Sequence, residues 1–297
     1  MISAFVVPMA MAYVPPKKKH PEVAYDKFKM YHTMLPQVGR LDVSNPGHQK
    51  RTRWSIGCET LDRDYATFAN YKHLLGPLGV GWARLQSGWA KCEKQKGVYD
   101  FAWLDEHVDG VIEQGMKPWL SLSYGNPLYS KDGVTLNSSI WTDEETMKAW
   151  DNYVRAIVRH YGDKVMMYEV WNEPDGWYAW KHGVNATEYG NFVIDTAKSV
   201  KAANPDAKII GGVTWHRELG YLNTAFKTGM CDYIDYLSFH EYTPDERQVY
   251  ERVTTLKALL SEYNPKVELI QGESGVYPLS EEFVSCAKEL CEKSGAL

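Results

Sequence analysis

Short runs of apolar residues alternate along the chain with longer segments in which apolar residues recur every three or four positions. The first pattern predicts buried strands, and the second predicts amphipathic helices. Strands are expected at residues 54–58, 80–86, 117–123, 166–173, 208–213, 236–240 and 267–273. Helices are expected at residues 65–75, 100–115, 142–161, 187–203, 243–263 and 280–293.

Strands that alternate with helices indicate parallel pairing, with the faces of the sheet covered. We therefore expect an α/β fold, a (β/α)8 TIM barrel, whose eighth strand is not evident in the sequence. A truncated C-terminus is the favoured explanation, and the apolar residues Phe5 to Val7 are the other candidate for the missing strand. A doubly wound open sheet is the alternative fold, although no Gly-x-Gly-x-x-Gly motif follows the first strand. Residues 1–53, rich in proline, are expected to form an extended leader, and residues 54–297 the barrel domain.

Composition narrows the possible functions. A net charge of −5 and one short basic run, residues 17–20, give no reason to expect nucleic acid binding. No run reaches the roughly 20 apolar residues of a membrane-spanning helix, so no span is expected. Residues 1–12 end like a secretory signal but lack its basic start, and they favour a secreted or periplasmic protein. The five cysteines show no Cys-x-x-Cys spacing and say little about compartment.

Two of the predicted strands end in a glutamate. The fourth ends at Glu173, where Pro174 stops a strand ladder, and the seventh ends at Glu273, which follows Gly272. Parallel α/β barrels carry their chemistry at this end of the strands. Strands four and seven of an eight-membered ring lie nearly opposite each other, so the two carboxylates should face across the mouth. Such a pair suits glycoside hydrolysis, in which one carboxyl donates a proton and the other attacks or activates water.

Other polar residues are placed to assist this pair. Arg84, near the tip of the second strand, is the cation that would keep Glu273 ionised, and Tyr242 would donate a hydrogen bond to the same carboxylate. Asn172 would donate to a substrate hydroxyl beside the reacting carbon. The carboxylate pair therefore has neighbours that can separate the pKa values of its two members.

Each position also has an ordinary structural interpretation. A strand-end glutamate such as Glu273 is more often a helix cap or a salt-bridge partner, and Arg84 can simply neutralise an acidic barrel mouth. His240 can be a core histidine or a metal ligand, but no second histidine stands at metal-binding spacing, so no metal and no cofactor are expected. Glu169, two positions before Glu173 and on the same side of the strand, is expected to be a buried and paired structural carboxylate.

From the first predicted strand to the seventh, the chain resembles glycoside hydrolase clan A, the retaining (β/α)8 glycosidases. The clan's acid/base, in Asn-Glu-Pro on strand four, matches Glu173, and its nucleophile on strand seven matches Glu273. An arginine on strand two matches Arg84, and a His-x-Tyr on strand six matches His240 and Tyr242. Family 39 is most similar at residues 98–105, 124–127 and 169–174, and family 5 at residues 271–275. The tryptophan of strand eight and the β-sandwich domain common in family 39 are not evident.

The resemblance implies a retaining glycoside hydrolase that cleaves β-linked O-glycosidic bonds in plant-type or other polysaccharides or oligosaccharides. Glu273 would be the nucleophile and Glu173 the acid/base of a double displacement. Aromatic residues form 13% of the chain, and their flat faces suit sugar rings. The residues expected to bind substrate are Arg84, Trp89, Tyr124, Asn126, Asn172, Trp177, Trp180, His240 and Tyr242.

Two rival classes stay open. A non-catalytic carbohydrate-binding barrel, derived from a truncated enzyme, would bind glycans without turnover. A metal-dependent barrel hydrolase would lose activity to a chelator. The sequence does not indicate which sugar and linkage are cut, whether the action is endo or exo, or the oligomeric state.

Overall fold

A computed structural model of the chain describes residues 52–130, 143–180, 183–215, 219–243 and 246–275. Most of the predicted leader, the helix predicted at residues 280–293 and the candidate strand at Phe5 to Val7 lie outside these ranges. The strands are β1 Ser55–Gly57, β2 Trp82–Gln86, β3 Lys117–Leu122, β4 Met167–Val170, β5 Lys208–Thr214, β6 Tyr236–Tyr242 and β7 Glu268–Gly275. All seven predicted strands are therefore present.

The seven strands form one sheet in which every strand pairs in parallel with the next one along the chain. This sequential order excludes the doubly wound sheet, in which the strand order reverses at one point. The sheet curls into a nearly closed barrel of the TIM type, short of one strand within the described residues. A cavity of about 920 Å³ opens between β1 and β7, the two strands that end the sheet.

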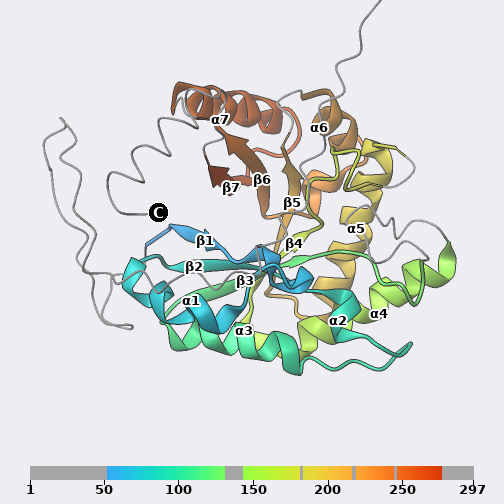
Figure 1. Cartoon of the computed structure of the whole chain (residues 1–297). Helices are drawn as coiled ribbons and strands as arrows, with labels where there is room; N and C mark the ends of the chain where they lie inside the picture. The colour runs from blue at the N-terminus through green and yellow to red at the C-terminus, as the bar shows by residue number, and fades with distance from the viewer. Residues whose placement is uncertain (1–51, 131–142, 181–182, 216–218, 244–245, 276–297) are drawn as a thin grey trace, which may run out of the picture. The chain divides into compact units, whose positions relative to one another are not determined.

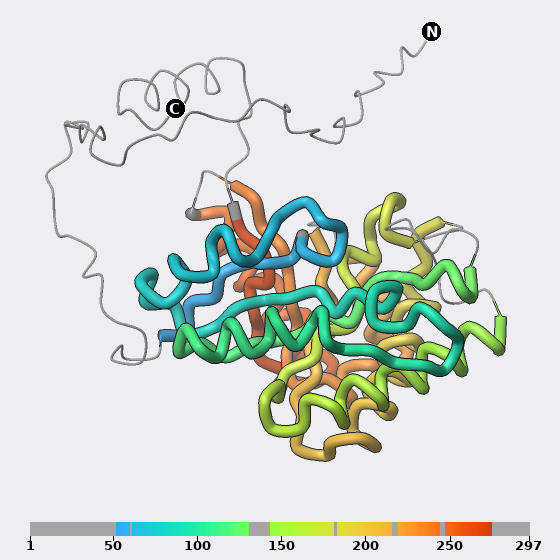
Figure 2. The backbone as a smooth tube through the Cα atoms, turned by 60° about the horizontal axis from the view of Figure 1, so that its bottom comes forward, coloured from blue at the N-terminus to red at the C-terminus, as the bar shows by residue number. Residues whose placement is uncertain are grey.

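Helices surround the strands (Figure 1), with α1 and α3 on one side and α7 beside β6 and β7 on the other. Figure 2 follows the chain from β1, in blue, to β7, in red. The helices are α1 Phe68–Leu75, α2 Trp89–Cys92, α3 Ala102–Glu113, α4 Glu144–Tyr161, α5 Ala186–Ala203, α6 Leu219–Phe226 and α7 Glu246–Ser261. Short 3-10 turns lie at η2 Glu59–Arg63, η3 Gly76–Leu78, η4 Gly162–Lys164 and η5 Met230–Asp232. None of the helices in the described segments combines the length and the apolar character that crossing a membrane requires.

Helix α4 shows how the apolar stripe and the cap define an element. Asp143 begins the helix, because its side chain accepts a hydrogen bond of 2.7 Å from the backbone N–H of Thr146. Thr142, where the predicted helix begins, lies outside the described residues. The stripe that includes Trp150, Tyr153 and Ile157 is buried against the barrel, as the sequence predicts.

Two helices are missing from the predictions, the four-residue α2 and the longer α6. Helix α6 has only eight residues, and Gly220 and Asn223 within it have low helix propensity. Its inner face, which includes Leu222 and Phe226, is buried, so packing against its neighbours stabilises the helix.

Candidate active site

The end of β4 is held in an unusual backbone conformation. Trp171 and Glu173 have φ values of 69° and 50°, in the left-handed region that side chains other than glycine seldom adopt. Each such residue costs on the order of 1–3 kcal/mol and persists only where its surroundings hold it. Here the Trp171 N–H donates to the carbonyl of Leu122, and the Glu173 N–H donates to the carbonyl of Val213, both at 3.0 Å. Backbone contacts to β3 and β5 thus direct the side chain of Glu173.

A β-bulge places Glu273 at the end of β7. Phe239 pairs with Gln271, but the next residue of β6, His240, pairs with Glu273, so Gly272 is an extra residue in the ladder. A Cβ on Gly272 would lie 2.3 Å from the hydroxyl oxygen of Ser238, so a larger residue here would displace the Ser238 side chain. The bulge brings Glu273 beside His240.

Arg84 is the centre of the charged cluster. Its side chain is fully buried, and it donates to Glu169 both from Nε, at 2.9 Å, and from Nη2. Nη1 lies 2.5 Å from Oε1 of Glu273 and 3.1 Å from Oε1 of Glu59, while Nη2 donates to Oδ1 of Asn172 at 2.8 Å. The expected buried pairing of Glu169 is confirmed. One guanidinium therefore joins residues from β4, from β7 and from the η2 turn after β1 at the same end of the barrel.

The Glu273 carboxylate is held in its ionised form. Burial raises its pKa, but the charge of Arg84, the charge of His240 and a hydrogen bond from Tyr242 outweigh burial and lower that pKa below its ordinary value. The Tyr242 hydroxyl donates to Oε2 at 2.6 Å, while Arg84 holds Oε1. The side chain keeps 19% of its surface exposed, so a substrate atom can reach it.

The Glu173 carboxylate lies across from Glu273. His240 Nδ1 is 2.9 Å from Oε1 of Glu173, and the hydroxyl of Tyr178 donates to Oε2. Ligand atoms of Glu173, His240 and Glu273 all lie within 4.8 Å of one another. The structure therefore brings together the two carboxylates, Arg84, Asn172, His240 and Tyr242, all of which the sequence analysis assigned to one site.

Three other residues that the sequence analysis assigned to substrate binding belong to the packed interior instead. Trp89 is fully buried and stacks on Tyr129 and Tyr153, with ring centroids 5.3 and 5.6 Å away. Trp180 is also fully buried, with its ring 5.8 Å from Trp171 and from Tyr189. Both predictions are wrong, because these rings fill space between the barrel and its helices.

Asn126 likewise has a structural role. It is 1% exposed, its Nδ2 donates to the carbonyl of Glu93 at 2.9 Å, and its Oδ1 accepts from the N–H of Leu128 at 2.9 Å. These bonds use the amide to hold the loop after β3. Asn126 is therefore also not a substrate-binding residue in this structure.

The two remaining aromatic candidates differ in exposure. Tyr124 is 7% exposed, and its hydroxyl accepts a hydrogen bond of 3.2 Å from Gln86 at the tip of β2. Trp177 is 63% exposed and contacts the ring of Tyr178, with centroids 5.9 Å apart. Only Trp177 has an open face of the kind that a sugar ring covers.

Two residues of the site were not predicted as functional. Tyr178 lies in the aromatic loop 177–180. The turn after Glu173 brings Tyr178 back to contact that carboxylate, and the sequence alone does not reveal this turn. Glu59 supports the site through Arg84.

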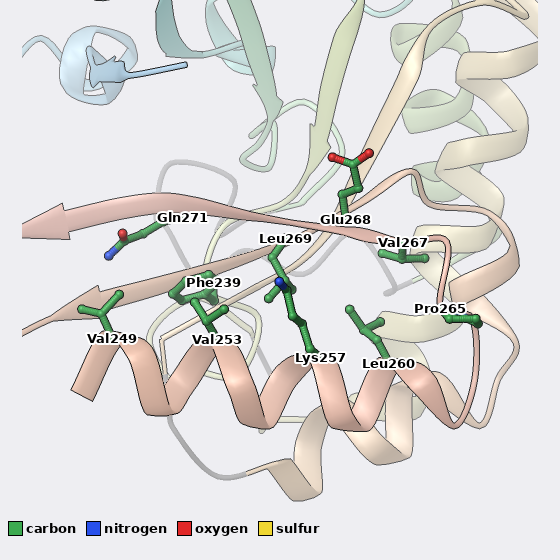
Figure 3. A pocket seen from close by; sticks show the side chains of 10 residues that line it. All are labelled: Phe239, Val249, Val253, Lys257, Leu260, Pro265, Val267, Glu268, Leu269 and Gln271. Atoms are coloured by element: carbon green, nitrogen blue, oxygen red, sulfur yellow. The ribbon is translucent and has the colours of Figure 1, made fainter. Parts of the chain in front are cut away.

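The cavity between β1 and β7 reaches this site, since Glu59, Tyr242 and Glu273 line it. A second hollow, of about 580 Å³, lies on the outer side of the sheet between α7 and β7. Figure 3 shows that Val249, Val253 and Leu260 of α7 face it, and Lys257 and Glu268 are its charged residues. It lacks a carboxylate pair, so the chemistry belongs to the first cavity.

Known proteins agree with this arrangement. The model of "Glycosyl hydrolases family 39" matches residues 81–271, which is more than half of the chain. Among curated proteins, no sequence matches the chain significantly.

Several solved structures share the fold. A monomeric β-xylosidase from Caulobacter crescentus CB15 is 20% identical with a TM-score of 0.59, over 78% of this chain and 54% of that one. A family 39 glycoside hydrolase from the gut symbiont Bacteroides cellulosilyticus WH2 is 19% identical with a TM-score of 0.60, over 80% and 53%. Xylanase 10B from Thermotoga maritima is 15% identical with a TM-score of 0.56, over 80% and 76%.

The chain thus spans about half the length of the first two of these structures. At these identities the likeness establishes the fold, whereas the family match runs from β2 into β7 and includes Glu173 but ends two residues before Glu273. The chain therefore belongs to glycosyl hydrolases family 39.

Proposed function

We propose that the protein hydrolyses β-linked glycosides with retention of configuration at the anomeric carbon. The observation that supports this most directly is the separation of the two carboxylates, since an oxygen of Glu173 and one of Glu273 lie within 4.8 Å. Retaining glycosidases hold their carboxyl groups about 5–5.5 Å apart, whereas inverting enzymes need about 6.5–9.5 Å to admit a water.

In the first step, Glu273 attacks the anomeric carbon and forms a glycosyl ester. The bond to the leaving oxygen breaks, and Glu173 supplies the proton that the leaving group takes. In the second step, Glu173 removes a proton from water, whose oxygen attacks the same carbon and releases Glu273. The lowered pKa of Glu273 suits the nucleophile, which must be ionised before substrate binds.

The surrounding residues have supporting roles in this mechanism. Arg84 and Tyr242 each hold one oxygen of Glu273, so the carboxylate is oriented before it attacks. Arg84 also donates to Oδ1 of Asn172, which leaves the NH₂ of that amide as the group to bind a sugar hydroxyl. Trp177, with its exposed ring, would stack on a sugar of the substrate.

The substrate class follows from the site and from its relatives together. The site combines its carboxylate pair with the amide of Asn172 and the exposed ring of Trp177, as expected for an oligosaccharide or polysaccharide. A β-xylosidase and a xylanase are among the proteins with the same fold. We therefore propose β-xylosides as the first substrates to test.

Release of a phenol from aryl glycosides tests the proposal. A panel of α- and β-linked xylosides, glucosides, galactosides, mannosides and arabinosides would be given to the wild type and to Glu273→Gln. We expect turnover of a β-linked member by the wild type alone, and NMR should show the β-anomer of the product first. Equal rates for the two proteins, or no turnover by either, would contradict the proposed function and favour a carbohydrate-binding barrel.

One observation favours a metal-dependent hydrolase as a second candidate. Glu173, His240 and Glu273 offer three ligand atoms within 4.8 Å of one another, and imidazole with carboxylates suits several divalent metals. Arg84 argues against it, because its permanent charge 2.5 Å from Glu273 repels a cation bound there. Activity that survives incubation with EDTA, and does not rise with added Zn²⁺ or Mn²⁺, would exclude this candidate.

A further inference from the structure

Tyr178 contacts Glu173 from the loop that follows β4. Its hydroxyl donates to Oε2 of Glu173, while His240 Nδ1 lies 2.9 Å from Oε1. The two oxygens are thus held from different elements, β6 on one side and the 173–178 loop on the other. A carboxylate held at both oxygens cannot rotate about its terminal bond without losing one of these contacts.

The turn before Tyr178 is built to allow this contact. A Cβ on Gly176 would lie 2.8 and 2.9 Å from two atoms of the Tyr178 ring, so any larger residue would push the ring away. The N–H of Gly176 donates to the carbonyl of Glu173 at 2.9 Å, which closes the turn. The close approach of Tyr178 to Glu173 therefore depends on a glycine that itself touches no reacting atom.

The ring of Tyr178 is enclosed on its flanks. Trp177 lies 5.9 Å and Trp215 6.2 Å away, measured between ring centroids. Burial, and after it the negative charge of Glu173, raises the pKa of Tyr178 well above its ordinary value. The hydroxyl therefore remains protonated, and so a hydrogen-bond donor, wherever the protein is folded.

The charged and titratable groups around this pair come from several elements. His240 on β6 and Glu273 on β7 lie within 4.8 Å of Glu173. Asp175 in the same loop and Tyr124 after β3 also act electrostatically on Tyr178. None of the hydrogen bonds described for these groups donates to Oε2 of Glu173, which Tyr178 holds.

We propose that Tyr178 is a positioning residue for Glu173, fixing the direction of its carboxyl. The inference rests on the proposed function, in which Glu173 is the acid/base. The hydrogen bond to Oε2 should affect the rate most for a leaving group that must be protonated. It should affect the rate least for a leaving group that departs readily without a proton. This difference between substrates separates a positioning role from a role in substrate binding.

Tyr178→Phe keeps the ring and removes only the hydroxyl. The probes are the phenyl and 2,4-dinitrophenyl glycosides of the sugar that the wild type accepts. We expect kcat/KM for the phenyl glycoside to fall about 10-fold and that for the dinitrophenyl glycoside to change by less than about twofold.

Gly176→Ala is the second variant, since it displaces the ring without removing the hydroxyl, and it should show the same difference between the two substrates. Tyr250→Phe, which removes a hydroxyl from an exposed tyrosine on α7, is the matched control and should leave kcat/KM for both substrates unchanged. No loss on the phenyl glycoside in both loop variants, or an equal loss on both substrates, would overturn the inference.

The outcomes also separate this inference from the proposed function. An active wild type, an inactive Glu273→Gln and a Tyr178→Phe that behaves like the wild type would overturn the role of Tyr178 alone. An active Glu273→Gln would instead remove the mechanism on which that role depends.

Discussion

Arg84 Nη1 lies 2.5 Å from Oε1 of Glu273, although Arg84 belongs to β2 and Glu273 to β7. The ion pair crosses the side of the barrel where β1 and β7 are not paired among the described residues. The same nitrogen is 3.1 Å from Glu59, just after β1. A single buried side chain therefore connects the two ends of the sheet at the level of the site.

Replacing Arg84 should damage both stability and activity. Arg84→Met leaves the fully buried Glu169 without its cation, which should cost about 3–5 kcal/mol of unfolding free energy. Glu273 loses the group that orients it, so kcat should fall at least about 100-fold. Urea denaturation and an aryl glycoside assay measure the two effects.

The double variant Arg84→Met with Glu169→Gln separates these effects. Removing the buried negative charge should restore part of the lost stability, whereas activity should stay low because Glu273 is still unsupported. No recovery of stability would contradict the interpretation of Glu169 as the structural partner of Arg84.

Tyr242→Phe should change the pH dependence of activity on the acid side. The Tyr242 hydroxyl helps to lower the pKa of Glu273, so its removal should raise that pKa. The nucleophile must be ionised, and the acid limb of kcat/KM should therefore move to higher pH, by up to about one unit. The alkaline limb should stay in place. A shift of both limbs would indicate a general distortion of the site.

The pH dependence of stability should also report on Glu273. Because its pKa in the folded protein is lowered, ionised Glu273 stabilises the fold above its unfolded pKa, and this contribution is lost as pH falls through the folded pKa. The difference in unfolding free energy between the wild type and Glu273→Gln should therefore shrink from neutral to acidic pH. Glu251→Gln, on the exposed side of α7, should show no such trend. A difference that grows toward acidic pH would contradict the lowered pKa.

The tryptophans of the 177–180 loop should respond in opposite ways. Trp177 is 63% exposed, so Trp177→Ala should mainly raise KM, with little change in stability. Trp180 is fully buried, so Trp180→Ala should cost about 3–5 kcal/mol of unfolding free energy. Chemical denaturation and steady-state kinetics of the pair test this. An unchanged KM for the first variant would remove Trp177 from the site.

The strands and the main site residues were predictable because local rules determine them. Pro174 has no N–H to donate to a strand ladder, so the strand formed by the apolar run must end before it. This places Glu173 near the tip of the strand without reference to tertiary contacts. Tyr242 ends its strand, and Arg84 and His240 each lie two residues before the end of theirs. Sequential parallel pairing then brings these tips together, as the structure confirms.

Other features depend on tertiary contacts that no local pattern contains. Trp89 and Trp180 are of the residue type that stacks on sugar rings, but the helices packed against them determine where their side chains point. The contact of Tyr178 with Glu173 requires the left-handed φ of Glu173, which depends on β3 and β5. Helix α6 is too short for its periodicity to stand out.

The bulge on β7 has a consequence for anyone who redesigns or transplants this site. A regular ladder would set Gly272 opposite His240 and Glu273 opposite Glu241, and the alternation of side chains would turn the carboxylate of Glu273 to the outer surface. Glu273, the proposed nucleophile, faces the interior only because Gly272 is an extra residue with no partner on β6. A graft that copied the glutamate onto an evenly paired strand would reproduce the motif and lose the geometry.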